Sequence, residues 1–358
     1  MVVHDRRLGR RAAKGVAAAL AVLLWGAAAS ADTVRWQEDA PARYTVQNGD
    51  TLWDIAERFL SAPWQWPRVW RRNPQVDNPG LIYPGDVLYL RDCDGAPCLG
   101  LERGRRVVKL SPQMRTLPRR QVVPPLPMRV LDAFLRDHRV VNASAPLDEL
   151  AYVIGGEDRR LISGAGDQVF VRAAASSRLA GRETGQRLGI FRPGETYQSA
   201  AGEPLGQELS SIGEGVLVSH SDDIARLHVH QAAREVRRGD VVLPLDPGLP
   251  TDDITPRAPR RAMNGRIVGV PGGVRFIGRL QVVAIDLGTE DGLQPGHVLR
   301  IAQQGERVAD PRTGERVRLP GEVAGSLVVF RPYDRVSYAI VMAATGTLSV
   351  GDSVRSPR

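Results

Sequence analysis

The sequence predicts an α+β protein in which a small strand–helix–helix–strand unit precedes two related, mostly-β domains. Around residue 50, alternating apolar and polar residues give way at once to the spacing of an amphipathic helix. From residue 129 onward, short β-rich runs are separated by Gly, Pro and Asp. Several motifs of this second part recur 111 or 112 residues later. We expect the chain to divide into five segments, residues 1–31, 42–91, 92–128, 129–245 and 246–358.

The first segment, residues 1–31, has the composition of a signal peptide. A basic head is followed by a short apolar run, Val16 to Trp25, and by the small residues Ala29-Ser30-Ala31. We expect cleavage before Asp32, secretion and a periplasmic location, with twin-arginine export as the alternative that Arg6-Arg7 raises. No cysteine lies at the cleavage point to carry a lipid, and no later stretch is long enough to cross a bilayer.

The charge of the remaining chain excludes nucleic acid as the expected ligand. The 358 residues carry a formal charge of +8, but residues 1–31 hold five of the 48 basic and one of the 40 acidic side chains. The other residues therefore carry 43 basic and 39 acidic side chains, a net +4, without a dense basic tract. A mild attraction to an anionic cell-wall polymer remains compatible with this charge.

Residues 42–91 have the pattern of one compact unit. Apolar and polar residues alternate from Tyr44 to Gln47, as in a strand with one buried face. Gly49 allows a sharp turn, and Asp50 or Thr51 can cap a helix whose apolar face is Leu52, Ile55, Ala56 and Phe59. A second helix is expected from Trp64 to Arg72, and Asn73-Pro74 ends it. A Pro84-Gly85 turn and a closing strand complete the unit.

The stretch YTVQNGDTLWDIAERF, followed by Asn-Pro and by LIYPGDVLYL, resembles the lysin motif, or LysM. The resemblance implies a small module that binds N-acetylglucosamine-containing glycans such as peptidoglycan and chitin. A tryptophan-rich segment between the helices and a second Asn-Pro at Asn78-Pro79 resemble a proteobacterial subgroup of exported LysM proteins. Members of that subgroup carry a longer β-rich region behind the module.

The LysM resemblance places the glycan site between two loops. One wall is implied to consist of Gly49, Asp50, Thr51 and Leu52, and the other of Pro79, Gly80, Leu81 and Ile82. N-acetylglucosamine is neutral, so it needs backbone donors and acceptors beside a small apolar surface. The same residues also suit plain structural roles in a turn, a cap or a core, and both roles are compatible.

Tryptophans stack well on sugar rings, but their spacing separates them here. Trp66 and Trp70 fall at helical spacing and are expected in the core. Trp53 follows Leu52 on a different helical face, where it would either flank the groove or be exposed to solvent.

Cys93 and Cys98 are the two cysteines of the chain. In an exported protein such a close pair is expected to form a small disulfide loop, with a free pair or half of a metal site as the alternatives. The prolines of residues 99–128 predict an extended linker, and a short helix is expected from Val130 to Arg136.

The repeat indicates a duplicated domain built from small barrels or sandwiches. LGIFRPGE (188–195) matches LRIAQQGE (299–306), and Gly239-Asp240 matches Gly351-Asp352. Between them, GVLVSH parallels LVVFRP and ARLHVHQA parallels SYAIVMAA.

A LysM-tethered wall hydrolase is the alternative function, and His228-Val-His230 is its strongest candidate motif. Alternate residues of a strand share a face, so both imidazoles suit a zinc ion. Such a metallopeptidase also needs a distant His-x-x-x-Asp pair, and neither His138 nor His220 has an Asp four residues later. In the repeat, the two histidines fall on Ile340 and Met342, which is typical of ordinary strand positions.

The sequence therefore predicts an exported, non-catalytic peptidoglycan-binding protein of the cell envelope. We expect no catalytic residue, no metal and no cofactor. The two β-rich domains are expected to face another partner, for which an envelope protein is one candidate.

Overall fold

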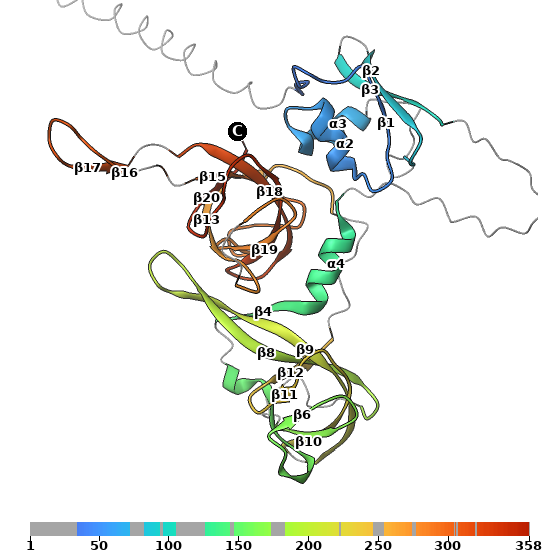
Figure 1. Ribbon diagram of the computed structural model, residues 1–358, viewed down its shortest axis with the longest axis vertical. Coiled ribbons are helices and arrows are strands. Elements are labelled where there is room, and N and C mark those ends of the chain that lie inside the picture. Colours follow the sequence, from blue (N-terminus) through green and yellow to red (C-terminus); the bar gives the residue numbers. More distant parts are fainter. Residues whose placement is uncertain are drawn as a thin grey trace, which may run out of the picture.

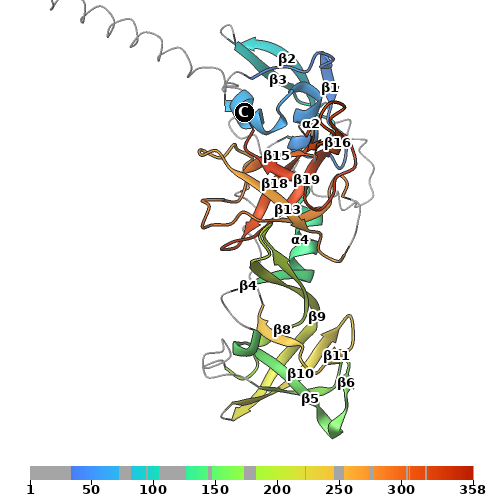
Figure 2. The same cartoon turned by 90° about the vertical axis from the view of Figure 1, so that its left-hand side faces the viewer.

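The computed structural model describes residues 34–71, 82–93, 96–104, 126–143, 147–172, 183–221, 223–245, 254–273, 277–303, 305, 307–318 and 321–357. The expected signal peptide, residues 1–31, lies outside this part of the chain. Figures 1 and 2 show an N-terminal α+β unit beside the C-terminal β body, with the other β body at the far end. Helix α4 (Met128–Asp137) runs between the two β bodies (Figure 1). None of the described helices is long and apolar enough to span a membrane.

The N-terminal unit has the expected element order and one additional strand. Its elements are β1 (Arg43–Thr45), α2 (Leu52–Phe59), the 3-10 turn η1 (Pro63–Gln65), α3 (Trp66–Arg71), β2 (Val87–Cys93) and β3 (Ala96–Glu102). The sheet order is β1-β2-β3, with both pairings antiparallel. Strand β3 comes from residues that the sequence analysis assigned to a disulfide loop and linker. The disulfide Cys93–Cys98, which was predicted, ties this hairpin together.

The core of this unit lies between the helices and the sheet. Trp66 and Trp70, on α3, pack edge to face at 6.4 Å between ring centroids and are both buried, as expected. They join the apolar face of α2 and residues of the strands in one cluster: Val46, Leu52, Ile55, Ala56, Phe59, Leu60, Val69, Ile82, Leu88 and Leu99. The apolar faces of the helices and of the strands thus pack together in a single core.

The first β body is a ring of six strands with a seventh strand added. The strand order is β10-β7-β5-β12-β8-β9-β4, and β10 also pairs with β9, which joins the row into a ring. The strands are β4 (His138–Asn142), β5 (Ala151–Gly156), β7 (Gln168–Arg172), β8 (Arg187–Gln198), β9 (Pro204–Ser221), β10 (Ile224–Ala232) and β12 (Val241–Pro244). The short elements between them are η3 (Leu147–Glu149), η4 (Glu157–Arg159), β6 (Ile162–Ser163) and β11 (Val236–Arg237).

The second β body is a closed barrel in the order β13-β14-β19-β18-β15-β20. Its strands are β13 (Asn264–Gly269), β14 (Val282–Ile285), β15 (Val298–Ala302), β18 (Val323–Pro332), β19 (Ser337–Ala344) and β20 (Ser353–Arg355). A separate hairpin, β16 (Arg307–Ala309) and β17 (Arg316–Arg318), projects from it (Figure 1). We call the two bodies the ring and the barrel.

The ring and the barrel have the same neighbour relations. If β5, β7, β8, β9, β10 and β12 are matched with β13, β14, β15, β18, β19 and β20, every pairing of the ring has its counterpart in the barrel. Val153 exchanges backbone hydrogen bonds with Gly239-Asp240, and Ile267 does so with Gly351-Asp352. The repeated Gly-Asp of the sequence therefore occupies the same turn in both bodies.

The two faces of the barrel wall are both apolar. Alternate residues of a strand point to opposite faces, and on β19 Ala339 and Val341 lie in the interior cluster. Tyr338, Ile340 and Met342 lie instead in a second, outer cluster. That outer cluster includes residues of α4 and Tyr197 of β8, so the barrel is covered by other parts of the chain.

The candidate glycan-binding turn

The turn between β1 and α2 is organised around Asp50. Its Oδ2 accepts hydrogen bonds from the Tyr44 hydroxyl at 2.9 Å and from the Gln47 backbone N–H at 2.7 Å. Gly49 has φ 95°, a conformation that glycine adopts without steric cost. A methyl group built at Gly49 would meet no described atom within 4 Å, so the space beside this turn is open.

Thr51, rather than Asp50, caps helix α2. The Thr51 hydroxyl accepts a hydrogen bond from the Asp54 backbone N–H at 3.1 Å. In return, Oδ2 of Asp54 accepts the Thr51 backbone N–H at 2.9 Å and its hydroxyl at 2.7 Å. This reciprocal arrangement satisfies two donors at the helix start and fixes the path of the turn.

The predicted site residues that the structure describes differ in exposure. Gly49 is exposed and Asp50 is partly exposed, so both are accessible from solvent. Thr51, Leu52 and Ile82 are buried, and the last two belong to the core of the unit. The other members of the predicted second wall, Pro79, Gly80 and Leu81, lie outside the described residues. Of the first wall, only the Gly49-Asp50 edge faces outward.

A buried carboxylate, that of Asp86, joins the segments around the start of β2. Asp86 is fully buried and accepts hydrogen bonds from the backbone N–H groups of Tyr83 and Gly104, each at 3.2 Å. The Arg103 guanidinium donates to the same carboxylate at 3.0 Å. The backbone N–H of Asp86 donates to the Tyr83 carbonyl, and the Asp86 carbonyl accepts from the Val46 N–H, so the start of β2 is connected to both neighbouring segments. The Asp of the Pro-Gly-Asp motif therefore ties the extra strand β3 to the unit, a role the sequence analysis did not foresee.

Trp53 is neither at the groove nor exposed. Its side chain is completely buried, and it belongs to the outer cluster of the barrel together with Met342 and Val282. The expectation for Trp53 was wrong because its side chain is not part of the core of the N-terminal unit and packs against the barrel instead. Trp64 lies in the same contact, with the Arg300 guanidinium 5.7 Å from its ring centroid.

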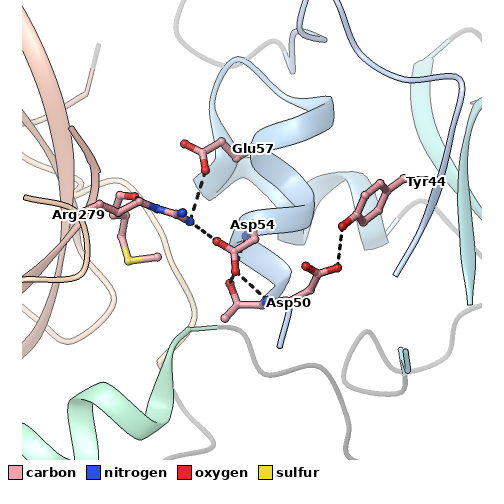
Figure 3. A network of polar contacts seen from close by, with 7 residues as sticks. Tyr44, Asp50, Asp54, Glu57 and Arg279 are labelled. Carbon is pink, nitrogen blue, oxygen red and sulfur yellow. Dashed lines mark hydrogen bonds and ion pairs between the residues drawn. The ribbon is translucent and has the colours of Figure 1, made fainter. Parts of the chain in front are cut away.

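An ion pair crosses the same contact next to the turn (Figure 3). Arg279, in the loop before β14, donates to Oδ1 of Asp54 and lies 3.7 Å from the Glu57 carboxylate. Burial raises the pKa of Glu57, and the positive charge of Arg279 only partly offsets that rise. Burial also raises the pKa of the Tyr44 hydroxyl, followed by its hydrogen bond to Asp50. Tyr44 thus stays a neutral donor at neutral pH.

The alternative metal motif lies on the outer surface of the ring. His228 and His230 alternate on β10 with Leu227 and Val229, which belong to the ring's interior cluster. On the same face, His228 is opposite Gln168 on β7 and Val216 on β9. In the part of the chain that the structure describes, no three His, Cys, Asp or Glu side chains are grouped closely enough to hold a metal ion.

Sequence reasoning missed Asp54, Glu57 and Arg279. Asp54 carried a signal, because Thr-x-x-Asp at a helix start is a variant of the capping box. Arg279 carried none, since it is 225 residues away from Asp54 in the chain.

Comparison with known proteins agrees with the geometry of this unit. An alignment of 66 residues, which covers 16% of this chain, is 36% identical to Uncharacterized protein YqbP of Bacillus subtilis (strain 168). The similarity spans 30% of that relative's length, so it concerns one segment of each protein. Residues 44–91 match the LysM domain family, and this part of the chain is a LysM domain.

Proposed function

We propose that this chain is an exported, non-catalytic protein that binds N-acetylglucosamine-containing glycan, in particular peptidoglycan in the periplasm. The observation that carries the proposal is the LysM match at residues 44–91. The open space beside Gly49 supports it, because a sugar acetamido group can approach backbone groups there. One such module binds weakly, but a wall presents many equivalent sites, so retention does not require high affinity.

Sedimentation with isolated sacculi tests this function. The full chain is expected to sediment with the sacculi, and chitin oligosaccharides should release it while cello-oligosaccharides should not. Gly49→Asn is the informative variant, because Asn tolerates positive φ but projects a side chain into the open space. Gly239→Asn is the matched control, since Gly239 has φ 87° and equally open surroundings in the ring. If Gly49→Asn and Gly239→Asn sediment to the same extent, and chitin oligosaccharides release neither of them, the proposed site is wrong.

The non-catalytic assignment is supported by where the candidate histidines lie. His228 and His230 occupy outward-facing positions whose counterparts in the barrel are Ile340 and Met342, two packing residues. Incubating the chain with labelled sacculi, with and without zinc or a chelator, provides the test. Metal-dependent release of soluble fragments would instead establish the wall-hydrolase alternative.

We infer further that the ring and the barrel arose by duplication of one domain. Their common neighbour relations and the repeated Gly-Asp turn support this origin. We also propose that the β bodies contact an envelope protein, which crosslinking in intact cells followed by identification of the captured protein would test.

A further inference from the structure

We propose that Arg279 of the barrel is a positioning residue for the glycan-binding turn, so that the barrel sets how tightly the LysM domain binds glycan. This inference rests on the proposed glycan-binding function and extends it to a residue outside the LysM domain. It starts from the polar network of Figure 3, which runs from Arg279 through Asp54 to the turn.

Asp54 is the junction of the network. Its Oδ1 accepts from Arg279, while its Oδ2 holds both the backbone N–H and the hydroxyl of Thr51. A carboxylate whose two oxygens are fixed from opposite sides has little rotational freedom. Thr51 directly follows Asp50, so the orientation of Asp54 controls the chain segment that leads to the open Gly49-Asp50 edge.

Arg279 is itself held in place by the barrel. Its Nε donates to the backbone carbonyl of Met342 at 3.0 Å, and the Met342 side chain is fully buried. The remaining N–H groups of the guanidinium are therefore directed at the carboxylates of Asp54 and Glu57. Because 47% of the Arg279 side chain is exposed, its ion pairs add little to the free energy of folding. Their main effect is to hold the Asp54 side chain in one orientation.

The residue that follows Arg279 differs from its counterpart in the ring, although the backbone turns in the same way in both bodies. Leu280 has φ 65° and donates its N–H to Val341 at 2.7 Å, and Gly166 in the ring has φ 93° and makes the corresponding bond to Val229 at 2.8 Å. A leucine in this left-handed region is strained, whereas glycine is not. The barrel thus keeps a strained residue immediately after the arginine that reaches the LysM domain, and the ring has alanine, Ala165, in place of that arginine.

Other contacts hold the LysM domain against the barrel without involving the Asp54 carboxylate. Trp53 is buried in the outer cluster, and Arg300 lies over the Trp64 ring. Removing Arg279 is therefore expected to loosen the turn while the two domains stay in contact. Because binding linkage is reciprocal, glycan binding should in turn tighten the contact between LysM domain and barrel.

Titration calorimetry of the full chain with a chitin tetrasaccharide tests the proposal, with three variants compared with wild type. Arg279→Ala is expected to weaken affinity about fivefold or more. Arg279→Lys, which keeps the charge, should recover part of the loss. Arg300→Ala is the matched control, because it weakens the domain contact but leaves Asp54 untouched, and its affinity should stay close to wild type. Equal affinity of Arg279→Ala and wild type, or an equal loss in Arg300→Ala, would overturn the proposal.

Amide hydrogen exchange of the free protein separates this inference from the glycan function itself. Arg279→Ala should accelerate exchange at Thr51, whose N–H is held by Asp54, and Arg300→Ala should not. If wild type fails to bind the tetrasaccharide, the proposed function is wrong, and the exchange data still show whether Arg279 positions the turn. Unchanged exchange at Thr51 in Arg279→Ala contradicts the inference in either case.

Discussion

Asp54 of the LysM domain accepts a hydrogen bond from Arg279 of the barrel, and the same carboxylate caps its own helix through Thr51. One side chain thus belongs to a local capping motif and to a contact between domains. The LysM domain does not stand apart from the barrel, because Trp53, the residue before Asp54, is completely buried in the cluster on the barrel's outer face.

The first prediction concerns Trp53. Trp53→Ala should lower the free energy of unfolding by about 3–5 kcal/mol, because it leaves a large cavity in the outer cluster. Trp53→Phe should cost clearly less, since the buried indole N–H has no hydrogen-bond partner within the described part of the chain. Urea unfolding monitored by circular dichroism measures both variants. A loss as large for phenylalanine as for alanine would contradict this account of the contact.

The second prediction concerns the charge of Glu57. Its pKa in the folded protein is raised, chiefly by burial, above the ordinary value of about 4.3. A raised carboxyl pKa stabilises the fold below the unfolded pKa, and that stability is lost as pH rises through the folded pKa. Glu57→Gln should therefore raise the Tm relative to wild type at pH 7 and lose this advantage near pH 4. The exposed Glu290→Gln serves as the control, and a lower Tm for Glu57→Gln at pH 7 would show that the Arg279 pair outweighs burial.

The third prediction concerns His297 in the barrel. Burial, and then the nearby Arg257, lower the pKa of this imidazole. A depressed histidine pKa gives stability that is present above about pH 6.5 and is lost as pH falls through the folded pKa. His297→Gln places in the barrel the residue that the ring has at the corresponding position, Gln186.

Thermal unfolding at pH 7.5 and in steps down to about pH 5 tests the role of His297. The drop in Tm over this range should be smaller for His297→Gln than for wild type. His220→Gln, at an exposed site of the ring, should retain the wild-type drop. Identical drops in all three proteins would rule out His297 as a source of acid sensitivity.

The fourth prediction concerns the disulfide Cys93–Cys98, which closes a short loop at the β2–β3 hairpin. Replacing both cysteines by serine should cost about 2 kcal/mol, the loop-closure contribution expected for so short a loop. Amide hydrogen exchange of the double variant should increase first in β3, which is an edge strand of the sheet. A reducing agent should have the same effect on wild type and none on the double variant, as followed by hydrogen exchange.

Local patterns in the sequence were sufficient for the elements of the LysM domain. The alternation at Tyr44 to Gln47 and the helical spacing from Leu52 to Phe59 gave β1 and α2 within one or two residues. Trp66 and Trp70 were assigned correctly to the core. Strand β3 was missed because a hairpin partner after two cysteines has no periodic signal that distinguishes it from an extended linker.

The sequence by itself determined the strand–helix–helix–strand order, the disulfide and the repeated turns, because each depends on residues close together in the chain. Only the tertiary structure decided what covers each apolar face. Ile340 and Met342 are buried beneath Trp53 and α4, whereas the corresponding histidines of the ring lie on its outer surface. The pairing of Arg279 with Asp54 has the same cause. Residue periodicity indicates which side of a helix or strand is apolar or charged. The residues that contact that side are decided by how segments far apart in the sequence pack together.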